Sequence, residues 1–216
     1  MNKSAMIIVF VFCIIMRSYS SSSIVVDNFN AEIANSFPSS WKAASKKGRT
    51  LYKILEENSN RYLNINVTDD SINIAKEIEW DLKQQPLLQW RWRIHKEPLG
   101  ADPRNESTFD CAAAVYVLIK NGFSPLPKYI KYIWCDNLEP GTRFFLKKNK
   151  AIVVMRGKND DLGEWYEEKR DVYEDYKYFY GDKKPKIKGI SILSDSNNTH
   201  SESEADYDDI IILSLK

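Results

Sequence analysis

The sequence has few histidines, few glycines and almost no net charge. It contains two His and eight Gly, and 31 basic residues face 30 acidic ones for a formal charge of +1. Two histidines leave little scope for His-based catalysis or metal ligation. A near-neutral chain is not the electrostatic partner that a nucleic acid requires, so no nucleic-acid partner is expected.

Common catalytic motifs are also missing. There is no Gly-x-Ser-x-Gly elbow, no His-Glu-x-x-His pair and no glycine-rich phosphate loop. A glycosidase needs only two suitably spaced carboxylates, which 30 acidic residues supply. Whether the protein is an enzyme therefore stays open, and a non-catalytic function is the favoured interpretation.

Aromatic residues are abundant, and most of the chain alternates between apolar and polar positions. The sequence has twelve Tyr, nine Phe and six Trp, a profile that suits β-strands. A period of two predicts strands with one buried and one wet face. The pattern predicts an all-β, jelly-roll-like sandwich of about nine or more strands, at 51–55, 63–67, 72–75, 88–94, 112–119, 129–134, 151–156, 188–193 and 210–215.

One segment, residues 162–180, shows a helical period. Trp165, Val172, Tyr176 and Phe179 recur at spacings of seven, four and three, which predicts one surface α-helix laid over a sheet. Aspartates at 160 and 161 are placed to cap its start, and Gly181 follows its end.

The first twenty residues have the features of a secretory signal peptide. Lys3 precedes an apolar run at residues 5–16, and small residues at 18 and 20 fit a cleavage site. Twelve apolar residues are too few to cross a bilayer, although an uncleaved anchor is the alternative. Cleavage after Ser20 leaves 29 basic and 30 acidic residues and no transmembrane segment. We expect a periplasmic or secreted protein whose single domain covers residues 24–216.

Two cysteines remain after that cleavage, Cys111 and Cys135. A hairpin centred near Phe123 places them opposite each other, and an oxidising compartment favours a disulfide. A register slip of one residue places them on opposite faces, so two buried free thiols are the alternative.

The strand at 88–94 carries the densest functional signal. Trp90 and Trp92 face one side of it, and Arg91 and Arg93 face the other. The arginines either pair with carboxylates of the chain, for which Asp110 is the proposed partner, or bind acidic groups of a ligand. Four aromatic residues are candidates for stacking on sugar rings, with core packing as their alternative: Trp80, the best placed, then Trp41, Trp134 and Tyr62.

The oxygen-rich segment 195–199 has two interpretations. It closes as a turn through its own side chains, or it holds a structural calcium ion with Asp195 and Asp209 as ligands. No other cofactor is expected.

Four stretches in this order resemble the bacterial family catalogued as domain of unknown function 3047. They are residues 86–93, 109–117 with 132–134, 170–181, and 189–199 with 207–210. The resemblance implies an extracytoplasmic jelly-roll sandwich similar to carbohydrate-binding modules, and it implies no established activity. Phe109, Ala114 and Asn197 depart from the family pattern, which has an acidic residue, an Arg and an Asp there.

Three functions follow as expectations. The first is non-catalytic binding of a glycan or similar polar ligand, with Arg91, Arg93, Asp110 and Trp80 as site residues. The second is a hydrolase or lyase of envelope polysaccharide, and the third is a structural envelope protein that engages a protein partner.

Overall fold

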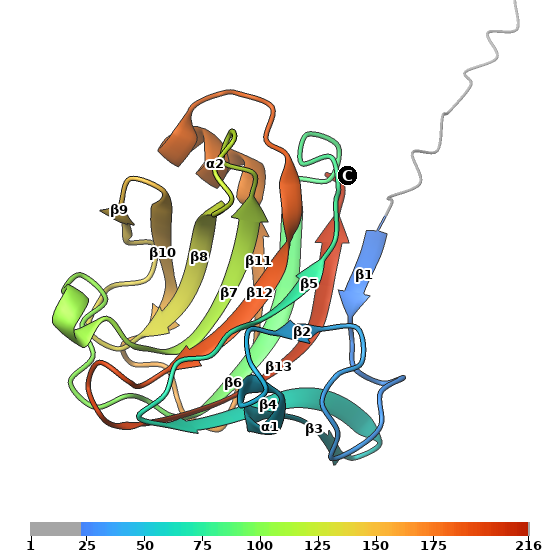
Figure 1. The fold of residues 1–216 in the computed structure, drawn as a ribbon, viewed down its shortest axis with the longest axis vertical. Coiled ribbons are helices and arrows are strands. Elements are labelled where there is room, and N and C mark those ends of the chain that lie inside the picture. Colours follow the sequence, from blue (N-terminus) through green and yellow to red (C-terminus); the bar gives the residue numbers. More distant parts are fainter. Residues whose placement is uncertain (1–22, 216) are drawn as a thin grey trace, which may run out of the picture.

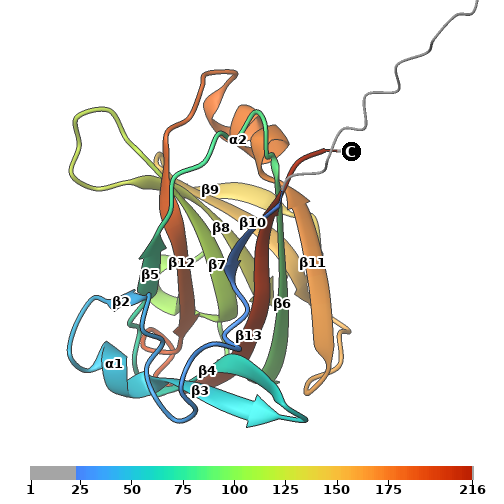
Figure 2. The same ribbon diagram turned by 90° about the vertical axis from the view of Figure 1, so that its right-hand side faces the viewer.

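The alternating segments build two β-sheets that pack face to face, with β5 and β12 on one side and β6 and β11 on the other in Figure 2. A computed structural model describes residues 23–215. Sheet A contains, in spatial order, β11 (Trp165–Asp171), β6 (Leu87–Lys96), β13 (Glu202–Leu213), β4 (Asn60–Thr68) and β3 (Tyr52–Glu57), and β1 (Ser23–Asp27) also pairs with β13. Sheet B contains β2 (Lys42–Ala43), β5 (Ile74–Glu77), β12 (Ile187–Asp195), β7 (Cys111–Ile119), β8 (Lys128–Cys135), β10 (Lys150–Gly157) and β9 (Arg143–Lys147). Only β8 and β10 pair in parallel among these strands.

The sandwich class is confirmed, and each of the nine predicted strands is present. Four further strands, β1, β2, β9 and β11, escaped prediction because they are short or lack clear alternation. Two short helical turns complete the fold, α1 (Gly48–Leu51) and η1 (Glu106–Thr108).

Aromatic side chains from both sheets form the centre of the core. Trp90 and Trp92 on β6 are fully buried, and so are Tyr132 and Trp134 on β8. The Trp90 and Tyr132 rings lie 5.4 Å apart, and those of Trp92 and Trp134 lie 6.1 Å apart. Alternation therefore turns both tryptophans inward and their neighbouring arginines onto the outer face of sheet A.

The predicted helix at 162–180 is half wrong. Its first part is strand β11, and only α2 (Val172–Tyr180) is helical. Asp171, rather than Asp160 or Asp161, caps α2 by accepting a hydrogen bond from the Glu174 backbone N–H at 2.9 Å. Gly181 ends the helix at φ 81°, as predicted. Figures 1 and 2 show α2 at one end of the sandwich, not over the face of a sheet.

The predicted signal peptide, residues 1–20, lies outside the described residues. Within residues 23–215, no helix combines the length and the apolar character that crossing a bilayer requires.

Candidate functional site

The two predicted arginines lie on the outer face of sheet A, and carboxylates of β13 hold both. Arg91 Nη2 lies 2.7 Å from Asp208 Oδ2, and its Nε lies 2.9 Å from Asp209 Oδ2. Arg93 Nη2 lies 2.8 Å from Asp206 Oδ2. The predicted partner Asp110 is wrong, because β13 supplies the carboxylates that face these strand positions. The ligand-binding role of the arginines stays a prediction.

Aromatic rings fill the space around Arg93. Its guanidinium carbon lies 4.7 Å from the Trp165 ring centroid and 5.2 Å from that of Tyr62. His95 Nε2 also lies 2.7 Å from the Asp206 carboxylate. The arginines and carboxylates on the outer face of sheet A thus pair with one another, which is the arrangement of a structural ion-pair network.

Asp110 belongs instead to sheet B, directly before β7. Its carboxylate accepts hydrogen bonds from the backbone N–H groups of Asn198 and Thr199, at 3.2 and 2.7 Å, and from Thr199 Oγ1 at 2.6 Å. Asp195, at the end of β12, is its neighbour. Burial raises the pKa of Asp195 to about 7, against the opposing effect of nearby Lys131 and with a further contribution from Asp110.

A β-bulge places these groups on the outer face of sheet B. Between β12 and β7, Leu193 pairs with Ala114 but Asp195 pairs with Cys111, so β7 has one extra residue. Three hydroxyl groups stabilise the bulge. Tyr207 on β13 accepts from the Ala114 N–H at 3.0 Å and donates to Leu193 O at 2.7 Å. The hydroxyls of Ser194 and Ser203 both donate to the backbone oxygen of Ala112, at 2.7 and 3.1 Å.

Lys131 on β8 is the least expected member of this region. The side chain is fully buried, and Nζ lies 4.4 Å from the Phe109 ring centroid and 5.3 Å from that of Tyr116. Neither Lys131 Nζ nor Asp195 Oδ1 has a hydrogen-bond partner within residues 23–215. A buried ionisable group without such a partner carries a large desolvation penalty.

A groove runs over the same face. It consists of two adjoining hollows of about 280 and 330 Å³ that share Leu118 and Pro127. The Tyr116 and Tyr129 rings form part of its wall, with centroids 5.1 Å apart. Tyr116 therefore both lines the groove and covers Lys131. The remaining lining is mixed polar and apolar: Ser71, Asn73, Ala75, Lys76, Glu77, Lys188 and Leu193.

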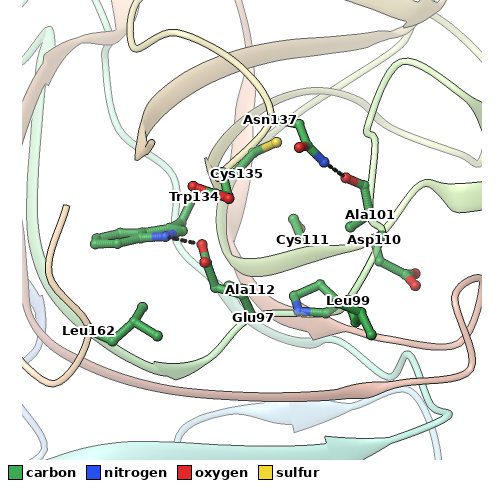
Figure 3. Close-up of a pocket in the computed structure, with 13 residues that line it drawn as sticks. Glu97, Leu99, Ala101, Asp110, Cys111, Ala112, Trp134, Cys135, Asn137 and Leu162 are labelled. Atoms are coloured by element: carbon green, nitrogen blue, oxygen red, sulfur yellow. Dashed lines mark hydrogen bonds between the residues drawn. The ribbon is translucent and has the colours of Figure 1, made fainter. Parts of the chain in front are cut away.

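A separate cavity of about 450 Å³, drawn in Figure 3, lies where β6 and β8 end and β7 begins, away from α2. Glu97 points into it and accepts a hydrogen bond from Trp134 Nε1 at 2.6 Å. Burial raises the pKa of this carboxyl group. Leu99 and Leu162 form apolar parts of the wall.

Cys111 and Cys135 are buried free thiols in this structure, and a disulfide between them stays a prediction. The predicted register is wrong by one residue, because Ala113 pairs with Trp134. The extra residue of the β7 bulge turns Cys111 back to the outer face of sheet B. Both cysteines therefore pack in the apolar cluster on that face. Burial raises the pKa of Cys111 to about 12 and that of Cys135 to about 11.

The predicted calcium ligands do not meet. Asp209 pairs with Arg91 on sheet A, whereas Asp195 lies beside Asp110 and Lys131 on sheet B. Residues 23–215 contain no group of three or more His, Cys, Asp or Glu side chains arranged to hold a metal ion. The positive charge near Asp195 comes from Lys131.

The aromatic residues predicted to stack on sugars pack in the interior or against neighbours. Trp80 is 9% exposed and donates through Nε1 to Gln85 O at 3.2 Å. Trp41 and Trp134 are buried, and Tyr62 lies under Arg93. The half-buried tyrosines of the groove, Tyr116 and Tyr129, were missed because alternation alone does not tell which outer faces are hollow.

The chain belongs to the family described as protein of unknown function (DUF3047), whose model matches residues 39–211, and the resemblance seen in the sequence is confirmed. No curated protein matches the sequence.

Three solved structures with a similar layout share little sequence with this chain. The family 30 carbohydrate-binding module of a Clostridium thermocellum cellulosomal cellulase is 11% identical, with a TM-score of 0.48 over 82% of this chain and 92% of that one. The family 11 carbohydrate-binding module of another cellulosomal cellulase of that organism is 8% identical, with a TM-score of 0.45 over 90% and 95%. Endoglucanase 3 of Trichoderma harzianum, from family GH12, is 7% identical, with a TM-score of 0.44 over 92% and 99%.

Proposed function

We propose that this protein binds a glycan, or a similarly polyhydroxylated ligand, on the outer face of sheet B without transforming it. One observation carries the proposal: Lys131 Nζ and Asp195 Oδ1 are buried on this face without a hydrogen-bond partner among the described residues. An ammonium group only donates hydrogen bonds, whereas Asp195 accepts them when ionised and also donates when protonated, as its raised pKa of about 7 favours. A hydroxyl group does both, so a sugar hydroxyl that enters as the covering rings of Phe109 and Tyr116 shift satisfies these groups without bringing in a charge.

The groove supplies the remaining contacts that a sugar requires. Tyr116 and Tyr129 offer partly exposed ring faces against which the apolar side of a sugar ring packs. Ser71 and Asn73 beside them offer hydroxyl and amide groups for its polar edge. Mixed aromatic and polar walls of this kind orient a ligand by a few directed hydrogen bonds.

The proposed location follows from the N-terminal sequence. The positive, apolar and small-residue regions of residues 1–20 support export, which places the protein in the periplasm or outside the cell. In that compartment, an envelope polysaccharide is the glycan that the protein would encounter.

Binding to a panel of envelope polysaccharides and oligosaccharides, measured by calorimetry, tests the proposal. Tyr129→Ala removes a stacking surface and is expected to weaken binding about tenfold. Lys131→Met removes a charged donor and is expected to weaken binding by about 10- to 100-fold. The matched control is Trp165→Ala on the outer face of sheet A, which leaves affinity unchanged.

Two results contradict the proposal. The first is the absence of binding to every polysaccharide on a broad panel by a protein that folds normally. The second is binding that Trp165→Ala abolishes and Lys131→Met does not affect. In the second case the ligand binds on sheet A, as the sequence first indicated.

The end cavity favours a hydrolase as the second candidate function. Glu97 has a raised pKa and lies against Trp134, which is the setting of a general acid. Release of reducing sugar from envelope polysaccharide that disappears in Glu97→Gln supports this function. Binding without product release leaves the binding function.

A further inference from the structure

The loop between β7 and β8 presents unusually exposed apolar side chains. Phe123 is fully exposed, and Leu126 is 73% exposed. Figure 2 shows this loop projecting from the end of the sandwich that carries α2. Exposing two large apolar side chains to water at the tip of a projecting loop is unfavourable, and such exposure marks a site of interaction with another surface.

Lysines lie at the base of this loop and along the segment beside it. Lys120 precedes the loop, and its N–H donates to Lys186 O at 2.8 Å, so the segment between α2 and β12 lies beside it. That segment also carries Lys183, and burial together with the charge of Lys183 lowers the pKa of Lys128 at the other end of the loop. Lys188 shares a wall of the groove with Pro127 of the loop.

Most of these charges are not neutralised within the protein. The side chains of Lys120, Lys183, Lys186 and Lys188 are exposed and form no ion pair with a residue in the range 23–215. Nearby carboxylates are already engaged, because Asp81 pairs with Lys184 at 2.8 Å and Asp182 accepts from the Tyr173 hydroxyl at 2.7 Å. Glu79, which is exposed at this end, forms no ion pair within residues 23–215, and against the four lysines it leaves an excess of positive charge.

We propose that this tip, defined as Phe123, Leu126, Lys120, Lys183, Lys186 and Lys188, docks the protein on an anionic lipid bilayer. The two apolar side chains enter the boundary between headgroups and acyl chains, while the lysines stay at the level of the phosphates. A polysaccharide or a nucleic acid engages the lysines but has no place for two exposed apolar side chains. The combination of both features identifies a lipid surface.

Co-sedimentation with vesicles tests the proposal. The purified mature chain is mixed with vesicles of phosphatidylcholine alone and of phosphatidylcholine with phosphatidylglycerol. We expect binding to the anionic vesicles only, and we expect it to weaken as salt is raised. Each Lys→Gln substitution at 183 or 186 is expected to lower the partition coefficient about fivefold.

A double variant, Phe123→Ser with Leu126→Ser, separates insertion from simple charge attraction. It is expected to lower vesicle binding at least tenfold while leaving the stability of the sandwich unchanged, because both side chains are exposed. The control is Leu99→Ser, which removes a leucine of similar exposure at the opposite end and leaves binding unchanged. The N-terminal segment is the same in all variants, so the differences report on the tip.

Three outcomes overturn the proposal: equal binding to neutral and anionic vesicles, retention of binding in the double variant, or binding to a soluble acidic polysaccharide in place of vesicles. Glycan binding on sheet B uses Lys131 and Tyr129, which these variants do not touch. A failure of membrane docking is therefore distinguishable from a failure of the proposed function.

Discussion

The outer faces of the two sheets differ in whether their buried charged side chains have ion-pair partners. On sheet A, Arg93 lies between aromatic rings and meets the Asp206 carboxylate at 2.8 Å. On sheet B, Lys131 also lies between aromatic rings, but neither it nor Asp195 Oδ1 has a hydrogen-bond partner among residues 23–215. Arg91 Nε on sheet A also has no hydrogen-bond partner in this range, but it lies 2.9 Å from the Asp209 carboxylate, whereas Lys131 forms no ion pair there. We propose that a ligand supplies what sheet B lacks. Sequence alternation predicts both as wet faces and does not distinguish them.

The largest expected effect is on sheet A. Asp206 is 1% exposed, and it accepts from Arg93, from His95 and from Asn64 Nδ2 at 2.8 Å. Asp206→Ala leaves a largely buried guanidinium without its main partner, so we expect a loss of about 3–5 kcal/mol in the free energy of unfolding. Urea denaturation measures it. A loss below about 1 kcal/mol contradicts the structural role assigned to this face.

A pH dependence of similar or smaller size belongs to sheet B. The pKa of Asp195 is about 7 in the folded protein, against 3.8 for the free side chain. The folded state therefore binds the proton more tightly, and its stability falls as pH rises from about 4 to 7. Such a shift corresponds to at most on the order of 4 kcal/mol.

The measurement compares wild type with Asp195→Asn by urea denaturation across this pH range. The variant lacks this part of the slope, and other groups titrate equally in both proteins. If the two curves stay parallel, Asp195 is not the buried acid described here.

A smaller effect is expected from Tyr207, which reaches from sheet A to the bulge in sheet B. Tyr207→Phe removes a hydroxyl that bonds Ala114 N–H and Leu193 O, so we expect a loss of about 1–3 kcal/mol. Ligand binding on sheet B should weaken as well, because the bulge positions Asp195. Tyr52→Phe is the control, since its equally buried hydroxyl contacts Ile72 O at 2.8 Å and Ile192 O at 3.0 Å and no residue of β7. Equal effects of both variants on ligand affinity argue against a positioning role for Tyr207.

The smallest change in stability is expected from Lys131→Met. Replacing an unpaired buried ammonium with an apolar group of similar length is nearly neutral or stabilising by about 1 kcal/mol. Asp206→Ala removes a paired group and is expected to be costly, whereas Lys131→Met removes a group without a hydrogen-bond partner in the described residues. A loss of several kcal/mol shows that Lys131 has a structural partner and removes the basis for a ligand there.

Local patterns predicted the strands well and the helix only partly. Trp90 and Trp92 face inward as their spacing requires. Trp165 also fits a helical stripe with Val172 and Tyr176, yet it lies on a strand because β6 offers seven paired residues to β11. Pairing between distant segments outweighed the local period. Cleavage of the N-terminal segment and the predicted export stay predictions.

The candidate site was predicted only in fragments. Asp110 and Asp195 were singled out for different reasons, as a partner of arginines and as a calcium ligand, and the structure places them side by side. Lys131 occupies an outward position between Ile130 and Tyr132, which alternation describes as exposed. Its burial depends on the Phe109 ring from the preceding loop, and a one-dimensional pattern does not include such cover.

By itself, the sequence determined the two-sheet class, the aromatic core and the outward position of the two arginines, because these follow from a period of two and the burial of apolar side chains. Only the tertiary structure decided that carboxylates of β13 pair with those arginines, and that Lys131 on the other outer face forms no ion pair within residues 23–215. The reason is the bulge at Ala112 and Ala113. It turns Cys111 and Asp195 to the same face, and hydroxyls from Tyr207 and Ser203 on the opposite sheet, about 90 residues along the chain, hold it there.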